Sequence, residues 1–138
     1  MDKREIYDFI KRQKITVIST ISKDNKPESA VIEFAETENL DLIFDTFSTS
    51  RKYKNLKENP YASFVIGWDE NITVQYEGVA SEIKGEELET YKAIYFAKNS
   101  RAKRWEEREN ITYFKVIPKW IRYSDLRMYP WKIYELKL

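Results

Sequence analysis

Apolar residues in the first part of the chain follow a helical period and then a strand period. Ile6, Phe9 and Ile10 have the spacing of one helical face, which predicts a helix over residues 2–13. The next apolar positions fall in short runs rich in β-branched residues, and a Ser-Lys-Asp-Asn-Lys-Pro segment between two runs favours a hairpin turn. The expected strands, which would form an antiparallel meander, are residues 15–21, 28–35 and 40–44.

The rest of the chain alternates helical and strand patterns. Tyr53 and Leu56 are three residues apart among Lys and Glu, and Asn59-Pro60 ends that helix. Gly78 interrupts a long alternating strand, where an isolated glycine favours a bulge that lets a sheet coil into a barrel. The expected elements are helices at 48–59 and 85–99, a charged connector of helical character at 100–110, and strands at 61–68, 72–83, 111–123 and 131–138.

These elements predict an α+β, mainly β fold built on a coiled antiparallel sheet. The pattern contains six or seven strands and two or three helices, with no internal repeat, low-complexity stretch or linker. A chain of 138 residues is too short to bury two separate cores. Residues 1–138 are therefore expected to form a single domain.

Composition limits the partners of this domain. The hydrophobic fraction is 42% and the aromatic fraction 15%, which supplies a core and argues against disorder. Lys plus Arg number 24 and Asp plus Glu 23, so a net charge of +1 creates no field that gathers nucleic acid or anionic membrane. No apolar run approaches the ~20 residues that span a bilayer, and the N-terminus leads into no secretory segment. The protein is expected in the cytoplasm.

The sequence contains no Cys and no His. These absences exclude disulfides, thiolate nucleophiles, histidine-based triads and His-ligated zinc, and no metal site is expected. Proton transfer, if the chain carries any out, falls to Asp, Glu, Lys or Tyr. Such a chain favours a cofactor that brings its own chemistry.

Residues 46–52, Thr-Phe-Ser-Thr-Ser-Arg-Lys, leave a predicted strand and open a predicted helix. The start of a helix offers unpaired N–H groups and a partial positive charge, and an Arg guanidinium can bind two phosphate oxygens at once. The simpler interpretation is that Ser48 or Ser50 only caps the helix and that Arg51 and Lys52 are solvated. The spacing alone leaves both interpretations open.

This segment and its surroundings resemble the pyridoxamine 5′-phosphate oxidase-like family, the FMN-binding split barrels. The resemblance covers residues 6–83, with weaker support from 111–123. Its most specific part is the spacing from the Ser-Arg-Lys helix start to the Asn-Pro pair. The matching residues are Ile43-Phe44-Asp45-Thr46, Ser50-Arg51-Lys52, Leu56, Asn59-Pro60 and a strand ending at Trp68.

The resemblance implies a six-stranded antiparallel split β-barrel with flanking helices, which forms a homodimer with FMN at the dimer interface. Ser50, Arg51 and Lys52 match the phosphate-binding positions, with Thr46 close by. The remaining implied cofactor residues are Val31 and Ile32, on the strand that borders the flavin ring; Thr73, where the family has glutamine, with Gln75 as its possible substitute; and Trp131 or Trp120, reaching the flavin of the partner subunit.

Departures from the vitamin B6 oxidases affect the expected reaction. Basic residues of their second strand correspond here to Ala30 and Ala35, and their C-terminal substrate-binding pattern has no counterpart, so oxidation of pyridoxamine phosphate is not expected. The resemblance instead implies an FMN-dependent oxidoreductase whose substrate, electron donor and catalytic side chains are unassigned. The alternative is a non-catalytic module that binds flavin or another phosphorylated cofactor, since some relatives bind F420 or haem. RNA binding through residues 98–108 is disfavoured because glutamates there cancel much of the charge.

Overall fold

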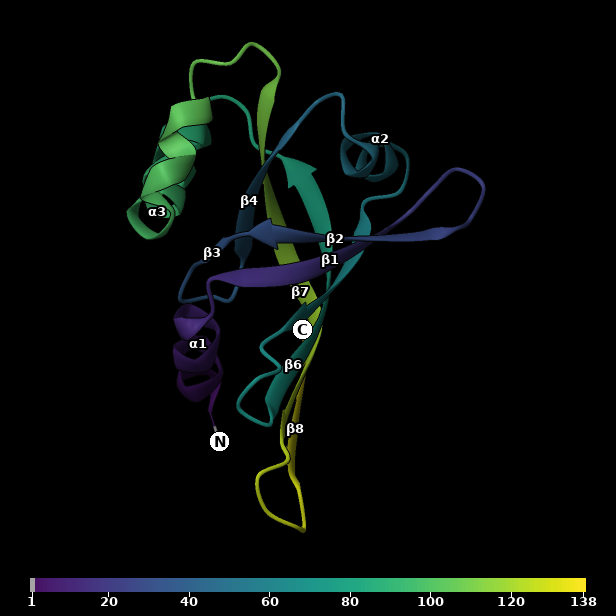
Figure 1. Ribbon diagram of the computed structural model, residues 1–138, viewed down its shortest axis with the longest axis vertical. Helices are drawn as coiled ribbons and strands as arrows, with labels where there is room; N and C mark the ends of the chain where they lie inside the picture. The colour runs from purple at the N-terminus through teal and green to yellow at the C-terminus, as the bar shows by residue number, and fades with distance from the viewer. Residues whose placement is uncertain (1) are drawn as a thin grey trace.

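Every strand pair in the computed structural model, which describes residues 2–138, is antiparallel and belongs to one sheet (Figure 1). The strands are β1 (Ile15–Ile21), β2 (Pro27–Glu33), β3 (Ala35–Glu36), β4 (Leu42–Phe47), β5 (Tyr61–Ile66), β6 (Ile72–Glu82), β7 (Ile111–Asp125) and β8 (Lys132–Lys137). The helices are α1 (Lys3–Arg12), α2 (Arg51–Glu58), α3 (Glu87–Lys98) and the 3-10 helix η1 (Ser100–Trp105). No helix within this described range is long and apolar enough to cross a membrane.

The two ends of the sheet are almost continuous in the chain. Strand order is β2-β1-β5-β6-β7-β4-β3, with β8 added beside β7. Because only Phe34 separates β2 from β3, the first and last strands of this order must meet, and the sheet has to curl round. The curl leaves a gap between β2 and β4, over which α2 packs against β1 and β4. The predicted split barrel is confirmed.

The strands differ from the expectation in number and in one pairing. Residues 2–138 contain eight strand segments rather than six, because the bend at Phe34 divides the second strand and β8 extends the sheet. The third strand of the predicted meander pairs with β3 only at its start. On its other edge the whole of β4, from Leu42 opposite Val116 to Phe47 opposite Ile111, pairs with β7.

The ladder is irregular at the glycine of the long strand, as its position predicted, with the extra residue, Lys119, on the partner strand β7. The β6–β7 register shifts between Glu77 and Gly78, and Gly78 lies opposite Pro118. A Cβ atom at Gly78 would lie 2.6 Å from the carbonyl oxygen of Ile117. The two backbones can therefore approach this closely only at a residue without a side chain.

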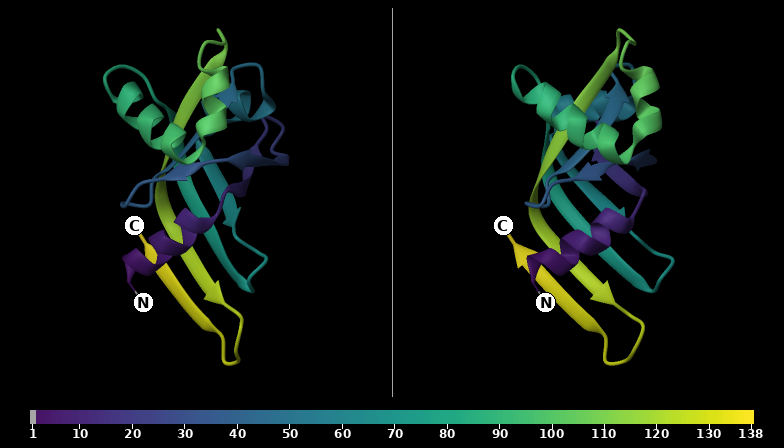
Figure 2. Two further views of the ribbon diagram at one scale, coloured as in Figure 1. Left: turned by 60° about the vertical axis from the view of Figure 1, so that its left-hand side comes forward. Right: turned by 90° about the vertical axis from the view of Figure 1, so that its left-hand side faces the viewer.

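Two apolar cores lie on opposite sides of the sheet. The larger fills the barrel and receives the predicted helical face of α1, with Ile6, Phe9 and Ile10 almost completely buried. The smaller lies between the outside of β3, β4 and β7 and helix α3, which Figure 2 shows across that end of the barrel. Its buried members are Ala35, Ile43, Ile83, Tyr95, Ala102 and Tyr113.

A third surface, the outer face of β1, β2 and β5, is apolar but exposed. Val31, Val17 and Val65 form one row across the three strands. The exposed fractions are 62% for Val31, 42% for Val65 and 65% for the neighbouring Tyr61. We call this surface the outer apolar face. Exposing such a contiguous apolar surface to water does not stabilise a single chain.

Candidate functional site

Strand β4 and the start of α2 bring two of the predicted site hydroxyls into contact. The Ser50 hydroxyl caps α2 by accepting the backbone N–H of Tyr53 at 3.2 Å, and its oxygen lies 2.7 Å from that of Thr46. The capping interpretation is therefore correct for Ser50. Capping leaves the backbone N–H groups of Arg51 and Lys52 without a protein partner among the described residues. These two groups are free to bind an anion.

The two cations that follow Ser50 have different surroundings. Lys52 is half-buried, and no carboxylate of residues 2–138 lies within ion-pair distance of its ammonium group. Burial lowers the pKa of Lys52, while the negative charge of Asp45 opposes that shift. The Arg51 side chain is 75% exposed, and its Nη1 lies 3.4 Å from Glu28 Oε2. Lys52 is thus the cation that lacks a counter-ion.

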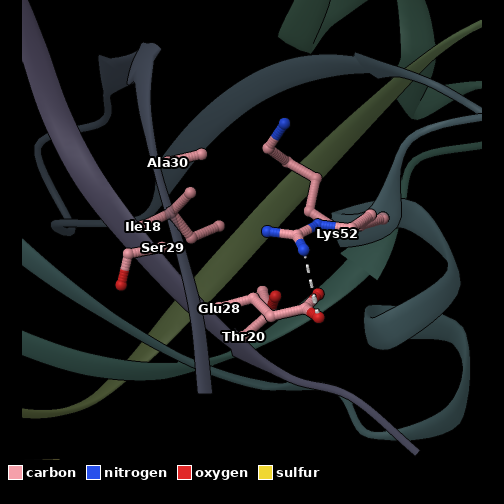
Figure 3. A pocket seen from close by; sticks show the side chains of 7 residues that line it. Ile18, Thr20, Glu28, Ser29, Ala30 and Lys52 are labelled. Carbon is pink, nitrogen blue, oxygen red and sulfur yellow. Dashed lines mark ion pairs between the residues drawn. The ribbon is translucent and has the colours of Figure 1, made fainter. Parts of the chain in front are cut away.

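These side chains border a pocket of about 130 Å³ in the split between β2 and α2. Figure 3 shows the pocket, with the Arg51–Glu28 ion pair as a dashed line. Its lining consists of Ile18, Thr20, Glu28, Ser29, Ala30, Arg51 and Lys52. Ala30, a small side chain, lines this pocket together with Lys52.

Three polar residues at this pocket were missed by the sequence analysis. The Asn55 amide donates to Thr20 Oγ1 at 3.0 Å and to Glu28 Oε1 at 2.9 Å, which ties α2 to β1 and β2. Asn55 and Thr20 are buried. One signal was available, since Glu28 precedes Ala30 and Ile32 on the inward face of an alternating strand, where a charged side chain needs a polar partner.

A second buried polar cluster lies on the other face of β4. Asp45 Oδ1 accepts the Tyr95 hydroxyl at 3.0 Å, but Oδ2 is buried and has no hydrogen-bond partner among residues 2–138. Tyr113 lies directly opposite Asp45 on β7, and its buried hydroxyl also has no partner in the part of the chain that the structure describes. Burial raises the pKa of Tyr113 to about 12. Burial raises the pKa of Asp45 as well, with the Tyr95 hydrogen bond opposing and Glu33 adding to the shift.

We expect the Asp45→Asn variant to be more stable than the wild type at neutral pH, by about 1 kcal/mol. The pKa of Asp45 is higher in the folded state than in the unfolded state, so the folded state binds a proton more tightly. The contribution of this carboxyl to stability therefore falls as the pH rises from the unfolded pKa through the folded pKa. Asn keeps the acceptor for Tyr95 and removes the buried charge. The gain should vanish below the unfolded pKa of ~3.9.

Urea unfolding at several pH values measures this difference. Asp69→Asn, which removes an exposed carboxylate in the β5–β6 turn, is the matched control for the loss of one negative charge. If Asp45→Asn is less stable than the wild type at neutral pH, the negative charge of Asp45 does not destabilise the folded state, and the prediction is wrong.

Strand β2, which carries the predicted residues Val31 and Ile32, is an edge of the sheet beside the pocket. Ile32 points into the core and is buried, whereas Val31 points to the outer apolar face. An edge strand has a row of backbone N–H and C=O groups that no neighbouring strand uses. This row faces the split, next to the pocket bordered by Arg51 and Lys52.

The other predicted residues lie away from the pocket within one chain. Gln75 is exposed on β6, in the same row as Val31 but three strands away, about 14 Å at the usual strand spacing. Thr73 lies two residues earlier on the same face. Trp131 is in the β7–β8 loop, which Figure 1 shows at the opposite end of the molecule from α2. Trp120, on β7, contacts Glu135.

The basic segment 98–108 uses its charged and aromatic groups within the chain. Lys98 pairs with Glu36, and both Arg104 and Arg108 lie over the Trp105 ring, at 4.7 Å and 5.7 Å from its centre. Phe47 meets the same ring edge-on. The indole is therefore already in contact with neighbours that a stacking base would have to displace.

The curled sheet is split between an edge strand and the start of α2, and this arrangement defines a split-barrel domain. Its pocket is lined by two cations, Arg51 and Lys52. A model of the pyridoxamine 5′-phosphate oxidase family matches residues 2–125. The chain belongs to this family. A pyridoxine/pyridoxamine 5′-phosphate oxidase from Ehrlichia ruminantium is 31% identical over 87 residues, which is 62% of this chain and 45% of that protein. The chain spans less than half the length of the curated relatives it matches.

Solved structures extend the likeness to the whole fold. General Stress Protein 26 from Bacillus anthracis superposes with a TM-score of 0.78 at 27% identity, covering 99% of this chain and 98% of that one. A heme binding protein from Mycobacterium smegmatis gives 0.85 at 15% identity, covering 98% and 57%. A pyridoxamine 5′-phosphate oxidase-related, FMN binding protein from Nostoc punctiforme gives 0.65 at 12%, covering 91% and 86%. The fold thus has both FMN-binding and haem-binding relatives.

Proposed function

We propose that this protein binds FMN in the split between β2 and α2 and acts as an FMN-dependent oxidoreductase. The observation that supports this proposal most is the half-buried Lys52, a cation without a counter-ion beside two free helix-start amides. A terminal phosphate would supply the missing negative charge and accept these donors. The same residues match the phosphate-binding positions of the family.

The donor set fits the two ends of FMN. Lys52, Arg51 and the free amides would hold the phosphate, with the hydroxyls of Thr46 and Ser50 beside it. The unpaired backbone edge of β2 near Val31 and Ile32 would offer hydrogen bonds to the flavin ring. Bound FMN would supply the redox chemistry, while the chain binds the cofactor, orients it and limits its contact with water.

A second copy of the chain would complete the site in this proposal. The outer apolar face, with Val31, Val65 and Tyr61 exposed, is the surface that a homodimer would cover. Val31 and Gln75 share this face, so dimerisation could bring Gln75 of one copy near β2 of the other. Trp131, remote from the pocket of its own chain, could contact flavin only across such an interface.

Haem is the second candidate cofactor, because the Mycobacterium smegmatis protein that shares this fold is a heme binding protein. The sequence contains no His or Cys, so a haem here would need a Tyr ligand. The pocket does not favour this arrangement, since it brings together cations and free amides and no Tyr lines it. A non-catalytic flavin carrier would use the same phosphate pocket.

The absorption spectrum of the purified protein, recorded before and after incubation with FMN and gel filtration, tests the proposal. We expect a flavin spectrum near one FMN per chain that dithionite bleaches. Reduction by NAD(P)H followed by turnover with an electron acceptor would support the oxidoreductase, whereas flavin that is bound but not reduced would favour the carrier. Protein that retains no flavin would contradict FMN binding, and light scattering on the same sample measures the dimer.

A further inference from the structure

The phosphate-type pocket contains a carboxylate as well as cations. Glu28, near the start of β2, points inward, and its side chain is 22% exposed. Its Oε1 accepts the Asn55 amide at 2.9 Å, and its Oε2 lies 3.4 Å from Arg51 Nη1. A negative charge is thus fixed at the wall of a pocket whose other charged groups would bind an anion.

Glu28 is held more firmly than Arg51. Asn55, which donates to Glu28, is 7% exposed and also donates to Thr20, which is 2% exposed. Turning Glu28 away from the pocket would leave this buried amide with an unmade hydrogen bond. Arg51, by contrast, has a side chain that is 75% exposed, and exposed ion pairs of this kind are weak. Arg51 can therefore leave Glu28 for another anion, while Glu28 stays.

We propose that Glu28 is a built-in counter-ion that competes with a ligand phosphate for Arg51 and repels that phosphate, so that the flavin is bound less tightly than the cations and free amides alone would allow. This inference rests on the proposed function and adds regulation of affinity at the same site. Removing the charge should increase FMN affinity about tenfold, as expected for one charge at pocket distance in a partly screened medium. High salt should reduce the gain.

Glu28→Gln separates the charge from the structural role of this side chain. Gln keeps a carbonyl oxygen that can accept the Asn55 amide, so the contact between α2 and β2 is retained. Glu58→Gln is the matched control. It removes an equal charge at the exposed C-terminal end of α2, away from the pocket.

The test is titration of wild type, Glu28→Gln and Glu58→Gln with FMN, riboflavin and inorganic phosphate, at low and high salt. In Glu28→Gln, FMN and phosphate should bind about tenfold more tightly at low salt, and FMN should survive gel filtration better. Riboflavin, which has no phosphate, should bind equally to all three proteins. Glu58→Gln should match the wild type.

Unchanged or weaker binding of FMN and phosphate to a folded Glu28→Gln variant would overturn the proposed role of Glu28 as a counter-ion. Phosphate that binds more tightly to this variant, when neither protein retains FMN, would support the counter-ion and contradict the proposed cofactor. If Glu28→Gln does not fold, as judged by circular dichroism, Glu28→Ser also removes the charge and undergoes the same titrations. An equal gain in riboflavin affinity would likewise overturn the proposal.

Discussion

The double substitution of Arg51 and Lys52 by alanine is expected to weaken FMN binding by at least a hundredfold. Each charge-assisted contact to a phosphate contributes roughly 1.5–3 kcal/mol, so losing two removes roughly 3–6 kcal/mol, and every ~1.4 kcal/mol is a factor of ten in affinity. Lys52→Ala alone should cost more than Arg51→Ala alone. Lys52 is half-buried without a partner, whereas Arg51 is exposed and also contacts Glu28.

Fluorescence titration with FMN and with riboflavin measures this effect. The loss of affinity should be confined to FMN, because the two cations would contact only the phosphate, which riboflavin lacks. Lys54→Ala is the matched control, since it removes a positive charge from an exposed position of the same helix and should change affinity about twofold at most. Equal FMN affinity in the double variant and the wild type would place the phosphate elsewhere.

Local patterns were sufficient to predict the parts of this fold that depend on neighbouring residues. The helical face of Ile6, Phe9 and Ile10 is buried as expected, and α2 begins at the Ser50 cap. The bulge at Gly78 was also predicted, because a glycine inside an alternating strand often marks a bulge or a close approach of two backbones. In each case the signal and the structure lie within a few residues of one another.

Features that depend on strand register were not predictable in this way. The third strand pairs mainly with β7, almost seventy residues later, and no local pattern of residues 42–47 specifies that partner. The same register places Asp45 directly opposite Tyr113, and each of them has a buried polar atom with no hydrogen-bond partner among the described residues. Glu28 and Asn55 meet for a similar reason, because the curl of the sheet brings β2 against α2.

The candidate site has one part fixed within the chain and one part that depends on another copy. Thr46, Ser50, Arg51 and Lys52 are brought together by one short segment, so their clustering follows from the sequence. Gln75 and Trp131 do not approach that cluster within one chain. Their predicted contact with a cofactor depends on the homodimer proposed above. The prediction came from the resemblance to a dimeric family, and the structure of one chain contains no second subunit.

The closure of the barrel itself depends on a residue without a side chain. Strand β6 pairs with β5 on one edge and β7 on the other, so a distortion at Gly78 would reach both ladders. An added Cβ would lie 2.6 Å from the Ile117 carbonyl oxygen and 2.8 Å from Val116 Cγ1. The first of these atoms is backbone and cannot rotate away, so the strands would have to separate.

Gly78→Ala is therefore expected to lower the free energy of unfolding by about 3 kcal/mol, the upper part of the range for overpacking a core. For a chain of this size the melting temperature should fall by roughly 10 °C. Gly85→Ala is the control, because Gly85 has a φ of +74° but an added Cβ would meet no atom of the described residues within 4 Å, so this variant measures backbone strain alone. That strain costs about 1–2 kcal/mol. Thermal and urea unfolding should show the larger loss at Gly78, and a Gly78→Ala variant no less stable than Gly85→Ala would mean that the bulge adapts to a side chain.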